Sequence, residues 1–466
     1  MKKITFLLLC LVSCAICATA QPTYTLQQLK DSALRNNIAI RSGQLDISSA
    51  KHQRKEAFTK YFPTVQGTGV WFNANKGMAQ TSVNLTEVVP PEVALSLAGS
   101  LPVEALVAMA NPIEVSMLKN GTVAGITAVQ PVFAGTQIIN GNKLARVGEE
   151  ASQLMLQLSE NEVEKQTEQY YWQIISLQEK LNTLNVVDSL LADIHKDVKV
   201  AIEAGVAMPN DMLQVQLRQN EMASNRLKVE NGISILKLVL AQYCGLKSDK
   251  FTVTSDVTTD VPALAAEANS AFFTSSLNAL PEYQLLSMQV KARKLEQRME
   301  LGKLLPTVAV GAGYNYHNLL DRDHTFGMIF ATVSLPISDW WGGSHAVQRK
   351  KIEYQKALDE QQDKSELLQI RMQKSYNDVC EAVKQVEIAQ RSIEQAKENL
   401  RLNRDYYSAG TSRMADLLEA QMLYQQACDQ HTDAIAEYHN KLLEYRQATG
   451  AQPLPSPQGE GQGWGL

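Results

Sequence analysis

The chain has 466 residues, a formal net charge of −5 and a charged fraction of 20%. This mildly negative balance excludes the basic footprint that a nucleic-acid-binding protein carries. No run of 18 consecutive apolar residues follows the first twenty positions, so no membrane-spanning helix is expected in the mature chain. If such a chain sits in a membrane, it must do so as part of a closed barrel.

The first twenty residues have the pattern of a secretory signal peptide. Two lysines near the start precede an apolar stretch from Ile4 to Val12, and small residues end at Ala20. We predict a signal peptide at 1–20 with cleavage after Ala20. The residues that end at Cys14 also resemble a lipobox, so lipidation of Cys14 stays open as the alternative. Both alternatives export the protein.

The remaining sequence contains an internal duplication. The segment Tyr61–Val65 recurs as Leu304–Val308, 243 residues later. The dipeptide at residue 204 recurs at residue 409, which is only 205 residues later. The difference of 38 residues predicts an insertion in the first copy. Two copies of this length indicate a duplicated half and not a solenoid.

This duplication gives the expected organisation of the chain. Each repeat starts with a helix, continues through two short strands, and ends with a very long helix and a return helix. The first repeat is expected at 21–245, with strands at about 62–73 and 121–133 around an insertion at about 76–119. A linker at 246–262 leads to the second repeat at 263–450, which has strands at about 305–316 and 325–336. A disordered tail is expected at 451–466.

The two very long helices are expected over Asn140–Glu203 and His345–Ala409. Both stretches lack proline and are rich in strong helix formers. A helix of about 64 residues would extend roughly 95 Å. Apolar residues recur every seven positions between Val379 and Tyr407, which predicts coiled-coil packing. The expected fold class is therefore mainly α, with long antiparallel coiled-coil helices and a small β region.

Each long helix is expected to end in an Ala-Gly turn and to return through an antiparallel helix. Two interpretations of the acidic residues after the turns stay open: they cap the return helices, or they lie at a tip that meets a partner or lines an entrance. The tip residues are Ala204, Gly205, Val206 and Asp211 in the first repeat and Ala409, Gly410, Thr411 and Asp416 in the second.

The strands carry the expected contact with lipid. Apolar residues alternate with small or polar ones in the first strand of the second repeat, and more loosely in the following strand. The residues predicted to face the membrane are Val308, Val310, Tyr314, Tyr316, Phe326 and Phe330. Four strands cannot close a barrel with an interior, whereas a trimer would supply about 12 strands. We therefore expect a homotrimer in contact with membrane lipid.

No catalytic, cofactor-binding or metal-binding motif is identified in the mature chain. Neither an enzyme activity nor a cofactor is therefore expected. Asp321, Asp323 and His324 could together bind a cation, but a solvated loop is the expected state. His195 and His431 fall on heptad positions, where a helix-packing or pore-facing role is expected and not a role as metal ligands.

The ordered duplication resembles the TolC-like outer-membrane factor family, the outer membrane efflux proteins, over residues 24–450. The resemblance rests on the Pro-bounded strand pairs, the long helices, the Ala-Gly turns and the start Tyr24–Leu29. It implies a homotrimeric passive duct, with a β-barrel in the outer membrane and an α-helical tunnel in the periplasm. It also implies a periplasmic adaptor at the tips and an inner-membrane pump of RND or ABC type. The expected function is the channel component of a tripartite efflux or type I secretion system.

A different class of function also fits long heptad helices. The alternative is a structural or adhesive coiled-coil protein of the cell envelope that has no channel. It would dissolve without detergent and conduct no ions, whereas a duct would form trimers in the outer membrane.

Overall fold

A computed structural model describes residues 22–76, 79–83, 113–117, 119–254, 276–319 and 322–450. The predicted signal peptide, the alternative lipidation site Cys14 and the predicted tail lie outside the described residues. Most of the predicted insertion and about half of the predicted linker also lie outside them.

The described chain forms two compact units, and each unit draws on both repeats. Unit 1 comprises Met1–Ala50, Gly148–Val290 and Lys356–Leu466, and unit 2 comprises Lys51–Val147 and Lys291–Gln355. The duplicated halves are therefore not separate compact domains, because each half contributes helices or strands to both units.

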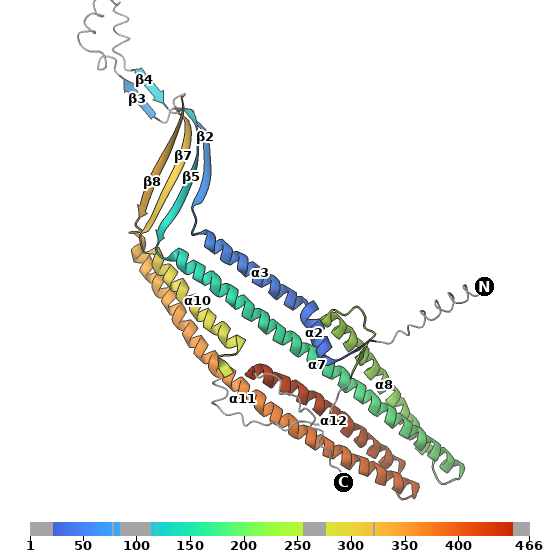
Figure 1. The fold of residues 1–466 in the computed structure, drawn as a ribbon. Helices are drawn as coiled ribbons and strands as arrows, with labels where there is room; N and C mark the ends of the chain where they lie inside the picture. Colours follow the sequence, from blue (N-terminus) through green and yellow to red (C-terminus); the bar gives the residue numbers. More distant parts are fainter. Residues whose placement is uncertain are drawn as a thin grey trace, which may run out of the picture. The chain divides into compact units, whose positions relative to one another are not determined.

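Unit 2 contains a four-stranded antiparallel sheet in the order β2-β5-β7-β8 (Figure 1). Its strands are β2 (Thr64–Asn73), β5 (Asn120–Ala134), β7 (Thr307–Leu319) and β8 (Arg322–Ser334). The first two come from the first repeat and the last two from the second. Strands β2 and β8 each pair with one neighbour only, so both edges of the described sheet are open.

Proline marks the ends of these strands, with one exception. Pro63 and Pro306 directly precede β2 and β7, where a missing amide donor costs no ladder hydrogen bond. Pro131 lies inside β5. The register of β5 against β7 shifts between Pro131 and Phe133, and such a bulge accommodates a residue without an N–H group.

The described parts of the predicted insertion contain a second, smaller sheet. Strands β3 (Ala79–Val83) and β4 (Ile113–Met117) form an antiparallel pair. The sequence predicts only an insertion here, although Ile113–Met117 alternates apolar and polar residues as a half-buried strand does.

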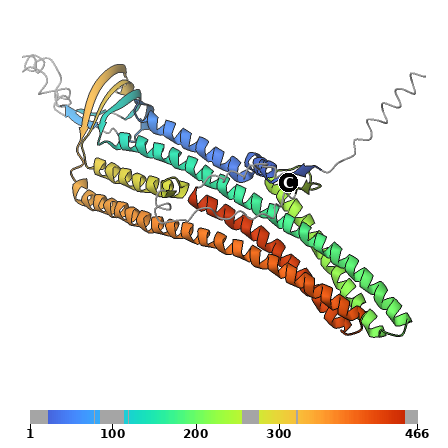
Figure 2. The ribbon, with the colours of Figure 1, turned by 60° about the horizontal axis from the view of Figure 1, so that its bottom comes forward.

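Four helices run from unit 2 into unit 1. They are α3 (Ile38–Thr59), α7 (Gln137–Glu203), α10 (Pro281–Lys303) and α11 (Asp339–Ser408). With 67 and 70 residues, α7 and α11 are slightly longer than the predicted helices Asn140–Glu203 and His345–Ala409. Within unit 1, α7 is followed by the return helix α8 (Pro209–Cys244), and α11 by α12 (Met414–Thr449). Figures 1 and 2 show α8 beside α7 and α12 beside α11, as two antiparallel hairpins.

The first predicted helix is broken in two by Asn37. Helix α2 (Leu26–Asn36) ends there and α3 begins directly afterwards. Asn37 has an extended backbone, and its side-chain oxygen accepts a hydrogen bond from the N–H of Ala39. Its side-chain amide donates to the carbonyl of Tyr243 at the end of α8. The break therefore depends on a contact about 200 residues away, which local sequence cannot show. Nearby, β1 (Thr23–Tyr24) pairs with β6 (Thr252–Val253).

The core of unit 1 joins the two hairpins. Val187, Leu191 and Val198 of α7 are fully buried with Val215 of α8, in the heptad pattern that the sequence predicts. The same cluster includes Met414 and Leu417 from α12. Full burial of one such side chain contributes about 1.5–3 kcal/mol, so this shared cluster holds the hairpins together.

None of the described helices combines the length and the apolar content that crossing a bilayer requires.

Candidate functional site: helical tips, an interhairpin seam and a two-faced sheet

The turn at the tip of the first hairpin is a Schellman motif, which ends a helix with a left-handed residue. Gly205 has φ +75° and lies directly after the C-cap of α7. Its N–H donates to the carbonyl of Ile202 at 2.9 Å, and the N–H of Val206 donates to the carbonyl of Ala201 at 2.9 Å. These two bonds satisfy carbonyls that the helix end would leave unpaired.

The second tip repeats this motif with the same spacing. Gly410 has φ +72°, and its N–H donates to the carbonyl of Tyr407 at 3.0 Å. The backbone N–H of Thr411 donates to the carbonyl of Tyr406 at 2.9 Å, and its hydroxyl donates to the same oxygen at 3.0 Å. The equivalent glycines therefore serve the same backbone function in both repeats.

The acidic residues after the turns cap their own helices. The carboxylate of Asp211 accepts a hydrogen bond from the N–H of Met208 at 3.3 Å. In the second hairpin the carboxylate of Asp416 accepts from the N–H of Arg413 at 3.0 Å. A carboxylate in the first turn also interacts favourably with the helix dipole. This geometry gives Asp211 and Asp416 a capping role, and it leaves the second interpretation, an entrance role, as a prediction.

The two tips differ in the surface that they expose. At the first tip Val206 and Met208 are 80% and 72% exposed. The equivalent positions at the second tip are Thr411 and Arg413. One tip of the pair is therefore apolar and the other is polar.

Polar side chains link the two hairpins along a line that we call the seam. Arg218 of α8 donates to Gln421 of α12 at 2.8 Å and to Gln425 at 3.2 Å. The Arg218 side chain is only 10% exposed, and Gln421 is fully buried. Hydrogen bonds that involve a buried charged group contribute about 1.5–3 kcal/mol each. Arg218 therefore connects the hairpins in a way that sequence periodicity did not reveal.

The seam continues away from the tips between α7 and α12. Lys180 and Ser176 of α7 both bind the carboxylate of Asp433, at 2.8 Å and 3.0 Å. Further along, the ring of Trp172 stacks on His439 with a centroid distance of 3.7 Å. Burial lowers the pKa of His439 to about 4, so the imidazole is neutral and acts as a packing group. Burial also lowers the pKa of His431, in accord with the predicted packing role.

The six residues predicted to face the membrane do not share one face of the sheet. Phe330 pairs with Gly311 and Phe326 pairs with Asn315, and paired residues point to the same side. A Cβ atom at Gly311 would collide with the ring of Phe330. Gly311 and Asn315 alternate along β7 with the other four predicted residues, which are Val308, Val310, Tyr314 and Tyr316. The prediction that all six residues face the membrane is therefore wrong. The pairing register of β7 with β8 decides which residues share a face, and the sequence of either strand alone does not show this register.

The register divides the sheet into an apolar face and a polar face. The apolar face carries Val308, Val310 and Tyr316 together with six residues that are 62% to 90% exposed: Val65, Trp71, Ile126, Tyr314, Ile329 and Val333. The polar face carries Gln66, Thr68, Thr127, Asn315, His317 and His324, with Val70, Phe72, Val123, Val129, Phe326, Met328 and Phe330 among them. An isolated sheet that leaves a whole apolar face uncovered indicates contact with lipid or with another protein.

No catalytic set of side chains was found in the part of the chain that the structure describes. No group of three or more metal-ligating side chains occurs in the described ranges. Cys244, Cys380 and Cys428 are free, and burial raises the pKa of the Cys244 thiol to about 12, which makes it unreactive.

Comparisons with known proteins agree with this geometry. Residues 284–451 match the sequence profile of the family described as outer membrane efflux protein. Solved structures match nearly the whole chain. The outer-membrane channel OprN is 15% identical, with 92% of this chain and 90% of that chain covered and a TM-score of 0.72. The chain has the TolC-like fold.

Two further channels show the same architecture. The outer membrane protein VceC of Vibrio cholerae is 12% identical over 91% of this chain and 96% of its own, with a TM-score of 0.69. CusC is 13% identical over 91% of both chains, with a TM-score of 0.74. No curated protein matches the sequence. The resemblance to the TolC-like family is confirmed, and this family consists of outer-membrane efflux channels and not of enzymes.

The tip glycines provide a direct test of the TolC-like hairpins. A Cβ atom would meet nothing within 4 Å at Gly205 or Gly410, so only the left-handed backbone limits substitution there. The double variant Gly205→Val, Gly410→Val should cost about 1–2 kcal/mol at each turn and should impair efflux while trimers persist. Efflux assays and heat-modified gel mobility measure both effects.

A matched control is the double variant Gly205→Asn, Gly410→Asn. Asparagine tolerates the left-handed conformation far better than a β-branched residue, so this variant should retain near-normal efflux. Unchanged efflux in the valine variant would contradict the placement of the functional tips.

Proposed function

We propose that this chain is one protomer of a homotrimeric outer-membrane duct that serves a tripartite efflux or type I secretion system. In this proposal the duct crosses the outer membrane and extends into the periplasm. A periplasmic adaptor connects it to an inner-membrane pump of RND or ABC type. The duct itself is passive, so the pump supplies the energy and selects the cargo.

The sheet carries this proposal. Both of its edge strands expose unpaired backbone groups, and one of its faces is apolar and uncovered. In lipid every backbone polar group must find a partner within the protein, so open edges must close against other strands. Three copies would supply about 12 strands, enough for a water-filled interior. The apolar face then contacts lipid, and the polar face lines the passage.

The tips support the proposed adaptor contact. Covering exposed apolar side chains such as Val206 and Met208 with a partner surface would be favourable, because it removes apolar area from water. The neighbouring tip offers Thr411 and Arg413 for polar contacts. An adaptor that docks across both tips would meet an apolar and a polar surface side by side.

The seam supports a closed resting state. Arg218 ties the two hairpins of one protomer through Gln421 and Gln425. Separation of the hairpins would break these two hydrogen bonds to a charged group, at about 1.5–3 kcal/mol each. Docking of the adaptor would then provide the free energy that separates the hairpins and widens the tunnel.

Conductance in planar bilayers tests the duct directly. The full-length protein, purified in detergent, should run as a heat-modifiable trimer and should produce discrete current steps. A water-soluble monomer without conductance would overturn the proposal and would favour the structural coiled-coil alternative.

The seam predicts a change in this conductance. The variant Arg218→Met removes the link between hairpins, and a loss of at least 1.4 kcal/mol would shift the equilibrium between closed and open states about tenfold. Mean current should rise accordingly. The matched control is Arg226→Met, because Arg226 pairs at 3.2 Å with Asp188 of the same hairpin. Equal effects of both variants would contradict the role of the seam.

Two adjacent residues of β8 test which face contacts lipid. Ile329 lies on the apolar face and Met328 on the polar face. Ile329→Lys should destabilise the inserted protein by about 2–4 kcal/mol, the cost of a cation in the lipid-facing band. Met328→Lys should insert normally and should shift the reversal potential towards anion selectivity. The reverse pattern in urea unfolding from vesicles would contradict the assignment of faces.

A further inference from the structure

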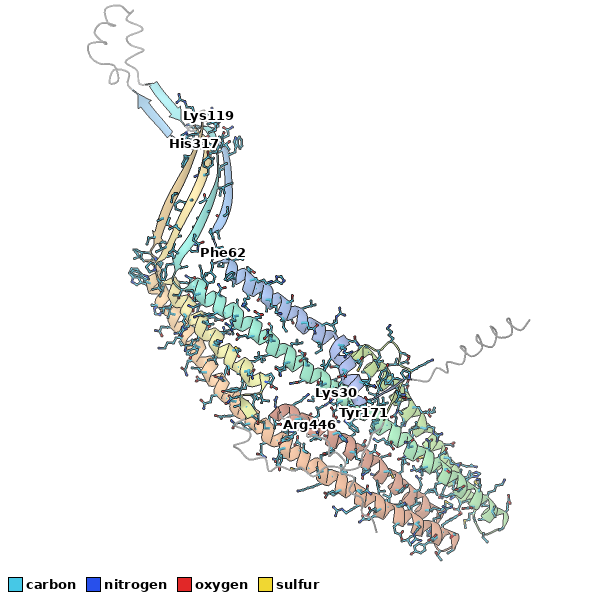
Figure 3. The ribbon with its side chains drawn as sticks, in the orientation of Figure 1. Lys30, Phe62, Lys119, Tyr171, His317 and Arg446 are labelled. Carbon is cyan, nitrogen blue, oxygen red and sulfur yellow. The ribbon has the colours of Figure 1, made fainter. Side chains whose placement is uncertain are left out.

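Two histidines lie side by side at one end of the sheet. His317 of β7 and His324 of β8 are direct partners in the register, so both point to the polar face. Their ring centroids are 5.3 Å apart with an interplanar angle of 48°. Figure 3 shows His317 at the end of the sheet opposite to Phe62. No role assigned so far to the sheet uses this pair.

One nitrogen of the pair lacks a partner within the described chain. The Nδ1 atom of His317 is buried from solvent, yet no described group hydrogen-bonds to it. Leaving such an atom unsatisfied costs about 1–3 kcal/mol. An imidazole nitrogen with a free lone pair is also the commonest metal ligand in proteins.

The spacing of the rings matches two-point metal ligation. Zinc binds imidazole nitrogens at about 2.0–2.1 Å with tetrahedral angles, which places the centroids of two ligating rings about 5.2 Å apart. The observed separation of 5.3 Å agrees with this value. The backbone hydrogen bonds between β7 and β8 hold directly paired residues at a fixed distance, so the two histidines are preorganised for metal binding.

The pair has an apolar wall on one side, and His324 is exposed to solvent. The ring of Phe326 lies 6.1 Å from each of the two histidine rings and forms an apolar wall beside them. Arg322 lies two positions before His324 on the same face. Its positive charge repels a bound cation and so lowers the affinity for the metal ion.

Asp323 is not available as a third ligand. It lies on the opposite face, where it accepts hydrogen bonds from Tyr316 at 2.7 Å and from Asn318 at 2.9 Å. Of the three residues that the sequence analysis weighed as a cation site against a solvated loop, Asp321 lies outside the described residues, and Asp323 and His324 lie on opposite faces of β8.

We propose that His317 and His324 form a binding site for a divalent transition metal of the class that prefers imidazole, namely Zn²⁺, Ni²⁺ or Cu²⁺. Water completes the coordination, so the ion exchanges readily. The site lies within one hairpin and does not require the proposed duct to exist. If the duct is real, the site lines its passage near the end remote from the helices.

Metal titration of the untagged full-length protein tests the site. Zn²⁺ should bind once per chain at pH 7.5, as measured by competition with a chromophoric zinc indicator. The variants His317→Asn and His324→Asn should each weaken binding at least about tenfold, since even outer-shell partners change metal affinity by that factor.

Two further variants and one spectrum make the test specific. His52→Asn changes an exposed histidine on α3 and should leave the affinity unchanged, while Arg322→Gln should strengthen binding. Electron paramagnetic resonance of the Cu²⁺ form should show two coordinating nitrogens, and one in each single variant. Wild-type affinity in His317→Asn and His324→Asn, with trimers and thermal stability retained, would overturn the proposal. So would the absence of any binding by the native chain. Neither result would affect the conductance test of the duct.

Discussion

A sheet with two open edges and one bare apolar face cannot be stable in water by itself. The backbone groups along β2 and β8 have no partners on their outer sides, and residues such as Trp71 and Ile329 are exposed over most of their surface. When copies of the sheet join edge to edge in lipid, the edge backbone groups find partners and the apolar face is removed from water. The proposed assembly, membrane contact and passage would all follow from this one structural constraint.

The duplication explains how one chain builds the helical region. Helices α8 and α12 have 36 residues each, and their bounds differ by the same 205 residues that separate the two tip glycines. Equal helix lengths and identical Schellman turns bring the two tips to equivalent positions on their hairpins. The side chains then differ: Val206 and Met208 at one tip correspond to Thr411 and Arg413 at the other. A repeated backbone thus presents unlike surfaces, which suits contact with a partner that is not itself repeated.

Much of the fold could be predicted because the signals are local. Heptad spacing and the lack of proline locate α7 and α11. A glycine followed by an aspartate locates each turn. The features that sequence analysis missed depend on distant contacts. Asn37 breaks a helix through its bond to the carbonyl of Tyr243, and the seam depends on Arg218 reaching another hairpin.

The two faces of β8 show more clearly that local sequence does not reveal features that depend on distant contacts. Phe326 and Phe330 alternate as a lipid-facing strand would, but the pairing with Gly311 and Asn315 turns them to the polar face. A shift of one residue in the register would reverse every side chain of the strand. The same register brings His317 and His324 together, although seven positions separate them in the sequence.

Closure of the sheet between protomers is the central claim, and disulfide cross-linking in membranes measures it most directly. One cysteine would replace Gly67 on β2 and a second would scan β8 from Thr325 to Met328, in a chain whose native cysteines are replaced by alanine. Paired strands bring Cβ atoms to about 4.5–5.5 Å, close to disulfide reach. Because β2 and β8 are opposite edges of one sheet, the account predicts covalent dimers and trimers for at least one pair and none for single cysteines. Only monomers at every position would contradict it.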